Sequence, residues 1–330
     1  MRVPYALLER AVTAHFQGLG LSAEHARSMA AVLLEAELEG NLGHGLTRIP
    51  QYTAQLRAGG LNPRPTLRLE QVRPALQVLK ADGAPGPVAG LYAVEALLPL
   101  VRHQGVAALA VQGAGHAGAL SAYVGRLAGS GLVGLAFANT PPAIAPGPVL
   151  GTNPIALGAP AEPHPVVVDT SVSVVARGKI IAAAKRGEAI PLGWAVDREG
   201  QPATDPQAAL EGSLVPIGEG KGYALAVLVE VLAGVLAGAV LSPDLPLPWA
   251  SPEAAAKPGL LLVGLEPTAF PGYAERMARL LKALQAAGGR IPGWRRVASR
   301  ERALQEGVPV GEALLEELAR SGLHLKGGKA

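Results

Sequence analysis

A histidine and an arginine stand four residues apart in the segment HGLTR, where His44 and Arg48 lie beside a predicted helix start. Side chains at that spacing can face one pocket. An imidazole passes protons at neutral pH, and a guanidinium grips a carboxylate through two parallel hydrogen bonds. The pair therefore suits proton transfer on a small acid, although a single histidine is more often structural than catalytic.

A second histidine, His116, lies in the glycine-rich segment GAGHAG at 113–118, between a predicted strand and a predicted helix. The segment satisfies G-x-G-x-x-G, which marks a dinucleotide-binding turn when an acidic residue follows about 20 positions later. Residues 96–161 contain no Asp or Glu, so this fingerprint is incomplete. We interpret the segment as a close-approach loop that carries a functional His116, and not as a Rossmann signature.

Three further segments place polar residues between apolar runs. GTNP at 151–154 presents Thr152, although a plain turn explains this segment equally well. DTSVSVVARGK at 169–179 ends a predicted strand in hydroxyls and a basic pair. GEGKG at 218–222 lacks the first glycine and the final hydroxyl of a Walker A loop, yet a lysine and glycines at a helix start attract an anionic cofactor.

Several classes of function are disfavoured by composition. The chain has no cysteine, which excludes disulfides, thiolate-bound metals and thiol catalysis, and fits a reducing compartment such as the cytoplasm. Its histidines form no i, i+4 pair and no H-E-x-x-H, so no metal is expected. No G-x-S-x-G elbow exists, which disfavours hydrolysis. The formal net charge is +3 without a long Lys/Arg run, so no nucleic-acid partner is expected.

The elements that position these residues change in type along the chain. Apolar residues recur at helical spacing through residue 58, and LNPRPTLRLE at 61–70 is interpreted as an extended connector. Short apolar runs then alternate with helical stretches, which favours an α/β layer structure. We predict strands at 75–81, 106–112, 132–138, 166–169 and 259–265, and helices near 87–103, 118–129, 271–289 and 311–321.

The segment at 222–241 is nearly all apolar and about long enough to span a bilayer. Glu230 lies in its middle, where a carboxylate is costly in lipid. Its small residues suit close packing against another element. We therefore predict a buried helix at a subunit interface, and no contact with a membrane.

Taken together in this order, the motifs resemble the type 2 malate/L-lactate dehydrogenase family, which includes sulfolactate and ureidoglycolate dehydrogenases, diketogulonate reductases and cyclic-imine reductases. The resemblance covers nearly the whole chain. It rests on HGLTRIPQY (44–52), GHAG (115–118), GTNPIALGAP (151–160), VVVDTSVSVVARGKI (166–180), IPLGWAVDREGQPATDPQAAL (190–210) and KGYALAVLVEVLAGVLAG (221–238).

The resemblance implies an α/β fold that is not Rossmann, similar to sulfolactate dehydrogenase, with a mixed-sheet cofactor domain and a helical domain. We accordingly expect a helical substrate-side domain at 1–70, completed by C-terminal helices at 291–330. The α/β cofactor domain with dimerisation elements is expected at 71–290. A homodimer is implied, with the site near domain and subunit boundaries.

The implied activity is hydride transfer between NAD or NADP and a small 2-hydroxy or 2-oxo acid such as malate or lactate. The implied catalytic residues are His44 as proton donor and acceptor, Arg48 as carboxylate clamp, and His116. The implied substrate contacts are Arg48, Thr152, Arg177 and Gly178. The implied cofactor contacts are His116, Ala117, Gly118, Asp169, Thr170, Ser171, Lys221, Gly222, Pro292, Gly293, Arg295 and Arg296.

Two positions depart from the family pattern. Many members have Ser before the catalytic His, where this chain has Gly43, and some have Asp where this chain has Lys179. The group that orients His44 is therefore open, as is the choice between NAD and NADP, since Arg295 and Arg296 could hold a 2′-phosphate or be exposed. Reduction of a cyclic imino acid or of another 2-oxo acid, among them the ureidoglycolate, sulfolactate and diketogulonate types, is one alternative. A dinucleotide-binding protein without catalysis is another.

Overall fold

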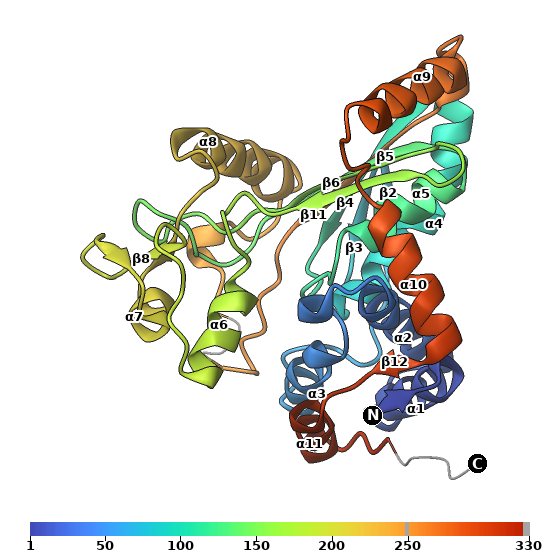
Figure 1. Ribbon diagram of the computed structural model, residues 1–330. Helices are drawn as coiled ribbons and strands as arrows, with labels where there is room; N and C mark the ends of the chain where they lie inside the picture. Colours follow the sequence, from blue (N-terminus) through green and yellow to red (C-terminus); the bar gives the residue numbers. More distant parts are fainter. Residues whose placement is uncertain (248–250, 326–330) are drawn as a thin grey trace.

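The computed structural model describes residues 1–247 and 251–325, and the chain forms a main body and a smaller lobe (Figure 1). The main body holds a seven-stranded sheet with the N-terminal and C-terminal helices. The smaller lobe has a core of its own, which includes Ile144, Val172 and Leu214. The elements of the lobe are α6 (Arg177–Arg186), β8 (Ala195–Val196), β9 (Pro202–Ala203), α7 (Pro206–Glu211), β10 (Ser213–Leu214) and α8 (Gly220–Val229).

The strands of the main sheet follow the order β2-β3-β4-β11-β5-β6-β7. Strands β3 and β4 are parallel, and each of the other neighbouring pairs described is antiparallel. A Rossmann sheet is mostly parallel, so the predicted mixed α/β sheet outside the Rossmann class is confirmed. The strands are β2 (Arg68–Arg73), β3 (Leu76–Lys80), β4 (Val106–Gln112), β5 (Val133–Ala138), β6 (Ile155–Ala159), β7 (Val166–Thr170) and β11 (Leu260–Leu265).

Helices α4 (Gly86–Gln104) and α5 (Ser121–Gly129) cover one face of this sheet. Successive residues of the central strand β11 serve opposite faces, as the pleat requires. Leu262 packs in the large core under α4 and α5, whereas Leu261 packs in a small cluster on the other face. That second face contacts the π-helix η3 (Glu230–Leu236), which continues α8 out of the smaller lobe.

The N-terminal helices α1 (Tyr5–Gly18), α2 (Ala23–Leu38) and α3 (Ile49–Arg57) share one core with α10 (Trp294–Glu306) and α11 (Glu312–Ser321). Helix α10 packs on α2, and α11 packs on α3. The exact division of the chain at 70 and 290 stays a prediction, and residues 326–330 lie outside the described part. Short elements complete the body: β1 (Arg2–Val3), β12 (Val308–Pro309), η1 (Leu42–His44), η2 (Leu46–Arg48), η4 (Ser242–Asp244) and η5 (Pro267–Ala269).

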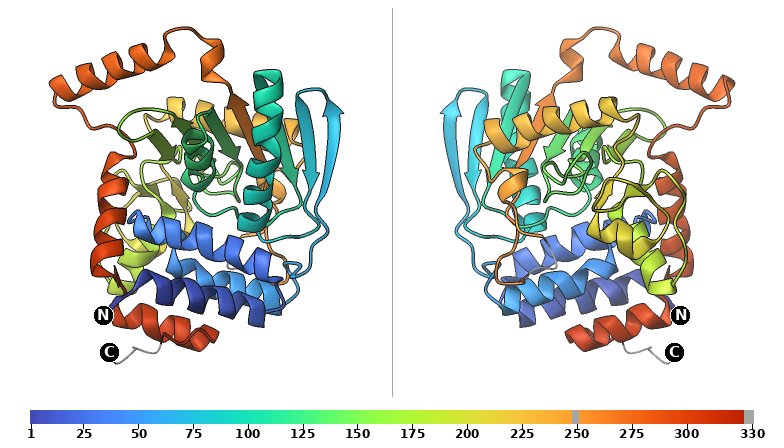
Figure 2. Two further views of the ribbon diagram at one scale, coloured as in Figure 1. Left: turned by 90° about the vertical axis from the view of Figure 1, so that its right-hand side faces the viewer. Right: turned by 90° about the vertical axis from the view of Figure 1, so that its left-hand side faces the viewer.

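Helix α9 (Tyr273–Ala286) extends from the body as an arm (Figure 2). Its leucines stand over the edge of the sheet, where Leu280, Leu284 and Val166 line an apolar cavity. The amphipathic helix predicted for this region is therefore present. It buries only part of its apolar face.

One expectation needs correction. The segment at 61–70 is not wholly a connector, because residues from Arg68 onward enter β2. This strand is exposed along its whole length and pairs only with β3 among the described strands, so its sequence carries no apolar alternation.

The apolar segment at 222–241 is buried on one face, at Val229 and Ala233, and exposed at Val231 and Val235. A helix at a subunit interface would leave such a face uncovered in the single chain, so the predicted interface stays a prediction. Within the described residues, no helix is both long and apolar enough to cross a membrane.

Two glycines let α5 lie close to the sheet. Gly134 and Gly158 are direct partners across β5 and β6. A Cβ at Gly158 would stand 2.0 Å from the Val124 carbonyl oxygen, and one at Gly134 would stand 2.5 Å from Leu127 Cδ1. Backbone cannot yield as a flexible side chain can, so the Gly158 contact fixes how closely α5 packs.

We expect Gly158→Ala to destabilise the protein by about 1–3 kcal/mol, because the added methyl group meets the α5 backbone. Gly129→Ala is the matched control, since a Cβ there meets nothing within 4 Å. The free energy of unfolding from denaturant titration measures both. Equal stability of the two variants would contradict this account of the packing.

Candidate active site

The turn after α2 carries both His44 and Arg48. It is built from two consecutive 3₁₀ turns, η1 and η2, that lead directly into α3. The His44 amide donates to the Asn41 carbonyl at 2.9 Å, and the Arg48 amide donates to the Gly45 carbonyl at 3.0 Å. The sequence expectation that both residues lie beside a helix start is confirmed, and both side chains are half-buried.

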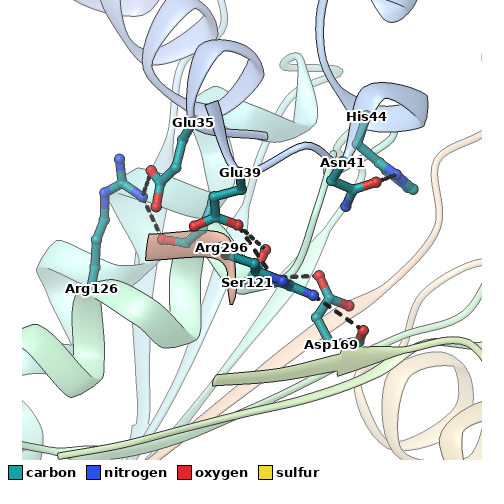
Figure 3. A network of polar contacts seen from close by, with 9 residues as sticks. Glu35, Glu39, Asn41, His44, Ser121, Arg126, Asp169 and Arg296 are labelled. Atoms are coloured by element: carbon teal, nitrogen blue, oxygen red, sulfur yellow. Dashed lines mark hydrogen bonds and ion pairs between the residues drawn. The ribbon is translucent and has the colours of Figure 1, made fainter. Parts of the chain in front are cut away.

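Asn41 orients the His44 ring. Its Oδ1 lies 3.2 Å from His44 Nδ1 (Figure 3), and an amide oxygen can only accept a hydrogen bond. The His44 Nδ1 atom must therefore carry the hydrogen, which leaves Nε2 with the lone pair. Asn41 thus fills the orienting role left open by Gly43 and Lys179, and it was missed in the sequence because an asparagine three residues before a histidine is not a distinctive signal.

The Arg48 guanidinium has neutral partners. Its Nε donates to the Gly43 carbonyl at 2.7 Å, and its Nη1 donates to Gln51 Oε1 at 2.9 Å. No carboxylate among residues 1–247 and 251–325 forms an ion pair with it. Burial lowers the pKa of Arg48, as expected for a charge without a counter-ion.

His116 lies against the same turn. Its ring stacks on the His44 ring, with 5.7 Å between centroids and 20° between planes. The Tyr52 hydroxyl donates to the His116 carbonyl at 2.8 Å and lies 2.9 Å from Nδ1. The Gly118 amide donates to the same Nδ1 at 3.2 Å. His116 Nδ1 is therefore an acceptor, and Nε2 carries the hydrogen.

Both imidazoles are uncharged at neutral pH. Burial lowers the pKa of His44 to about 4, and the positive charges of Arg48 and Arg296 act in the same direction. Burial likewise lowers the pKa of His116, again with Arg48 adding to the effect. The site therefore offers a neutral proton acceptor, His44 Nε2, beside a permanent positive charge.

A second polar cluster lies next to this group (Figure 3). The Asp169 carboxylate accepts the Ser121 amide at 2.8 Å, at the first residue of α5. Arg296 reaches the Asp169 carbonyl and the Glu39 carboxylate, each at 3.5 Å. Burial raises the pKa of Glu39 and of Asp169, so the one guanidinium compensates them only in part.

This cluster suits a dinucleotide in a way that differs from a Rossmann turn. A helix N-terminus normally binds the pyrophosphate there, but at α5 the Asp169 carboxylate takes the first amide. The contacts of Arg296 are longer than the usual 2.7–3.2 Å, so its guanidinium is not held tightly. A cation of this kind and the Ser121 hydroxyl are the donors that phosphate and ribose require.

The structure gathers several predicted site residues of the smaller lobe into a separate group. The Thr152 carbonyl accepts the Val172 amide at 3.0 Å, and the Ser171 hydroxyl lies 3.0 Å from that of Ser173. Gly222 is pressed against the Val172 carbonyl, where a Cβ would stand 2.9 Å away. The exposed predicted residues in this part of the chain are Thr170, Gly178 and Lys221.

Arg177 and the segment at 292–296 have identified structural contacts. Arg177 donates to the Leu210 carbonyl at 2.6 Å, which joins α6 to α7. The Pro292 carbonyl accepts the Val167 amide at 3.1 Å, so this segment lies along β7. A Cβ on Gly293 would stand 2.9 Å from the Val167 nitrogen. Arg295 is exposed, in contrast to Arg296.

Sequence reasoning missed three residues that shape the site besides Asn41. Tyr52, Glu37 and Glu39 are buried or half-buried polar residues in predicted helices. A polar residue on the buried face of an amphipathic helix is the signal that could have identified Glu37. The described residues contain no group of three or more His, Asp or Glu side chains able to hold a metal ion.

The chain is similar to proteins of known activity over almost its full length. It is 39% identical over 317 residues to a (2R)-3-sulfolactate dehydrogenase (NADP(+)) of Chromohalobacter salexigens, covering 94% of this chain and 95% of the relative. It is 32% identical over 320 residues to a ureidoglycolate dehydrogenase (NAD(+)) of Escherichia coli O157:H7, covering 92% and 91%.

A solved structure shares the fold. The delta1-piperideine-2-carboxylate reductase from Pseudomonas syringae pvar. tomato superposes with a TM-score of 0.91 at 33% identity, covering 97% of this chain and 99% of that protein. The malate/L-lactate dehydrogenase family matches residues 3–319. The chain therefore belongs to the malate/L-lactate dehydrogenase family of NAD(P)-dependent oxidoreductases.

Proposed function

We propose that this enzyme interconverts a small 2-hydroxy acid and its 2-oxo acid, of the malate, lactate or sulfolactate kind, with Arg48 binding the carboxylate and His44 moving the proton. The observation that carries the proposal is the half-buried Arg48 guanidinium, whose partners are neutral, in the same turn as His44. A bound carboxylate supplies the missing counter-charge.

Each residue has a distinct task in this proposal. Arg48 holds the substrate carboxylate in a fixed orientation, which places the reacting carbon. In oxidation, His44 Nε2 accepts the hydroxyl proton, while Asn41 keeps the hydrogen on Nδ1. In reduction, the protonated His44 ring donates the Nε2 proton to the oxygen of the 2-oxo acid. His116, whose ring stacks on that of His44, donates its Nε2 hydrogen to a carbonyl oxygen of the substrate or cofactor.

The substrate also adjusts the acidity of His44. The Arg48 charge lowers the pKa of His44 in the free site. A carboxylate on Arg48 offsets that charge and raises the proton affinity of the ring. Binding the acid therefore prepares the imidazole for the reaction.

NAD or NADP supplies the hydride when bound. We assign its contacts to the His116–Gly118 loop, to Asp169, Thr170 and Ser171 at the end of β7, and to Arg296. The half-buried position of Arg296, between the Glu39 carboxylate and the Asp169 carbonyl, supports this assignment. Thr152 is assigned to the substrate. The remaining assignments, which rest on family resemblance, are Arg177 and Gly178 for the substrate and Lys221, Gly222, Pro292, Gly293 and Arg295 for the cofactor.

The exposed face of α8 and η3 supports a homodimer. Leu228, Val231, Val235 and Leu236 are each at least 45% exposed on consecutive turns of this helix. A contiguous apolar surface of this kind marks a protein interface.

We also propose that the enzyme works in a reducing compartment, the cytoplasm, because the chain has no cysteine.

A cyclic imino acid is a second candidate substrate. The similarity to a delta1-piperideine-2-carboxylate reductase favours it, since an imine carbon beside a carboxylate presents the same geometry to Arg48. The imine carbon accepts the hydride as the carbonyl carbon does, and Arg48 binds the neighbouring carboxylate in both cases.

A substrate panel tests the function. We expect oxidation of NADH or NADPH with pyruvate, oxaloacetate, sulfopyruvate or a cyclic imine-2-carboxylate, and His44→Ala should lower turnover about 100-fold or more because the proton donor is lost. Cofactor affinity, read from the fluorescence of the bound reduced cofactor, should be retained. His103→Ala, an exposed histidine on α4, is the control. Cofactor binding without turnover on any substrate would instead support a protein that binds dinucleotides without catalysis.

Arg48→Lys tests the carboxylate clamp. A lysine keeps the charge but loses the planar fork, so we expect kcat/KM for the 2-oxo acid to fall about 100-fold. Arg57→Lys at the end of α3 is the control, because Arg57 contacts the Ser321 carbonyl and not the site. Wild-type kinetics for Arg48→Lys would remove the clamp from the mechanism.

The acidity of His44 predicts the pH dependence. Oxidation requires the neutral ring, so kcat/KM for the hydroxy acid should rise through the pKa of about 4 and stay level at higher pH. Reduction requires the protonated ring, so its kcat/KM should fall about tenfold for each pH unit above that value. Rates measured in both directions across the pH range check this. An oxidation limb at the ordinary imidazole pKa would contradict it.

A further inference from the structure

One buried carboxyl group, from α2, contacts the turn that carries His44 and Arg48. Glu37, near the end of α2, is 5% exposed, and its Oε2 accepts the Leu46 amide at 2.8 Å. Leu46 lies between His44 and Arg48 and is the first residue of η2. The first amides of a helical turn have no partner within the turn, so the carboxylate satisfies a donor that the core would otherwise leave unpaired.

The carboxyl group is costly where it stands. Burial raises the pKa of Glu37 to about 7, and the Leu46 amide opposes that rise only in part. No arginine or lysine among the described residues forms an ion pair with it. A leucine would fill this interior position at lower cost, so the hydrogen bond to the turn is what the glutamate contributes.

The turn is shaped around this side chain. A Cβ on Gly45 would stand 2.1 Å from Glu37 Oε2 and 3.1 Å from Glu37 Cβ. Because Gly45 has no side chain, the backbone between His44 and Arg48 can lie in close contact with the Glu37 carboxylate. The Leu46 side chain beside it is fully buried, which anchors the same point to the helical core.

We propose that Glu37 is a positioning residue for this reaction, which holds the backbone between His44 and Arg48 so that the imidazole and the guanidinium keep their relative placement. This inference rests on the proposed function of those two residues. Glu37 touches neither substrate nor cofactor in it. The Thr47 hydroxyl donates to the Leu42 carbonyl within the turn, and the Asn41 amide donates to the Ala36 carbonyl of α2 at the start of the turn. Glu37 fixes the centre of the turn to α2.

Glu37→Leu removes the acceptor and fills the space, whereas Glu37→Gln keeps an oxygen for the Leu46 amide. For Glu37→Leu we expect kcat to fall and KM for the 2-oxo acid to rise, with kcat/KM reduced about 100-fold by a displacement near 1 Å. Glu37→Gln should keep most of the activity. Affinity for the reduced cofactor should not change in either variant.

The split between kcat and KM separates positioning from loss of stability. A variant that only unfolds more readily has fewer active molecules, which lowers apparent kcat and leaves KM unchanged. Leu34→Ala, a buried residue one turn earlier on α2, is the matched control for that effect. An unchanged KM in Glu37→Leu, or equal loss in Glu37→Gln and Glu37→Leu, would overturn the proposal.

Gly45→Ala perturbs the same contact from the opposite side. Its methyl group displaces the carboxylate, so we expect a loss of kcat/KM. Glu37→Ala, which removes the same acceptor as Glu37→Leu, should lose kcat/KM as well. The double variant Glu37→Ala/Gly45→Ala relieves the 2.1 Å clash, so its loss should be smaller than the product of the two single losses. Losses that multiply fully would mean that the two residues act independently, which contradicts the proposal.

Hydrogen exchange of the Leu46 amide gives a readout that needs no turnover. It should be slow in the wild type and in Glu37→Gln, and at least tenfold faster in Glu37→Leu and in Gly45→Ala if the bond contributes about 1.4 kcal/mol. Unchanged exchange in Glu37→Leu would overturn the proposal. If the wild type reduces no 2-oxo acid or imine, the proposed function fails, while the exchange result still reports whether Glu37 holds the turn.

Discussion

An uncharged imidazole and a charged guanidinium share one half-buried turn, and the electrostatics of the site follow from that pairing. His44 and Arg48 have neutral partners, and burial together with the Arg48 charge keeps the ring deprotonated. The missing component is a negative charge, which a carboxylate brings. In the proposed function, substrate recognition and proton affinity are therefore coupled through a single Coulombic interaction, and the contact that binds the acid also activates it.

Buried side chains hold this turn, since Leu46 lies in the helical core, and a close backbone approach holds the loop beside it. A Cβ on Gly86 would stand 2.2 Å from the His116 carbonyl oxygen, so the start of α4 presses on the loop that stacks His116 over His44. On the other side, Asp169 takes the first amide of α5. A Rossmann domain offers that amide to phosphate, whereas here the nearest cation is the Arg296 side chain.

The sequence could predict what depends on neighbouring residues. The spacing of four residues between His44 and Arg48 predicted that both lie beside a helix start. The missing acidic residue after the glycine-rich loop correctly argued against a Rossmann sheet. Contacts between distant segments were invisible, as for Tyr52, which meets His116 at a separation of 64 residues. Strand β2 was missed because it is exposed throughout. The apolar helix at 222–241 is buried on one face in the single chain, and burial of its other face at a subunit interface stays a prediction.

Helix α10 reaches the candidate site through Arg296, which contacts Glu39 at a separation of 257 residues along the chain. Its guanidinium lies between two carboxyl groups whose pKa values remain raised, so it has not been neutralised by either. The same charge lowers the pKa of His44. Since the Coulombic effect falls with distance, the position of α10 affects the proton affinity of both Asp169 and the His44 imidazole. The helical core that joins α10 to α2 therefore supports the site electrostatically as well as mechanically.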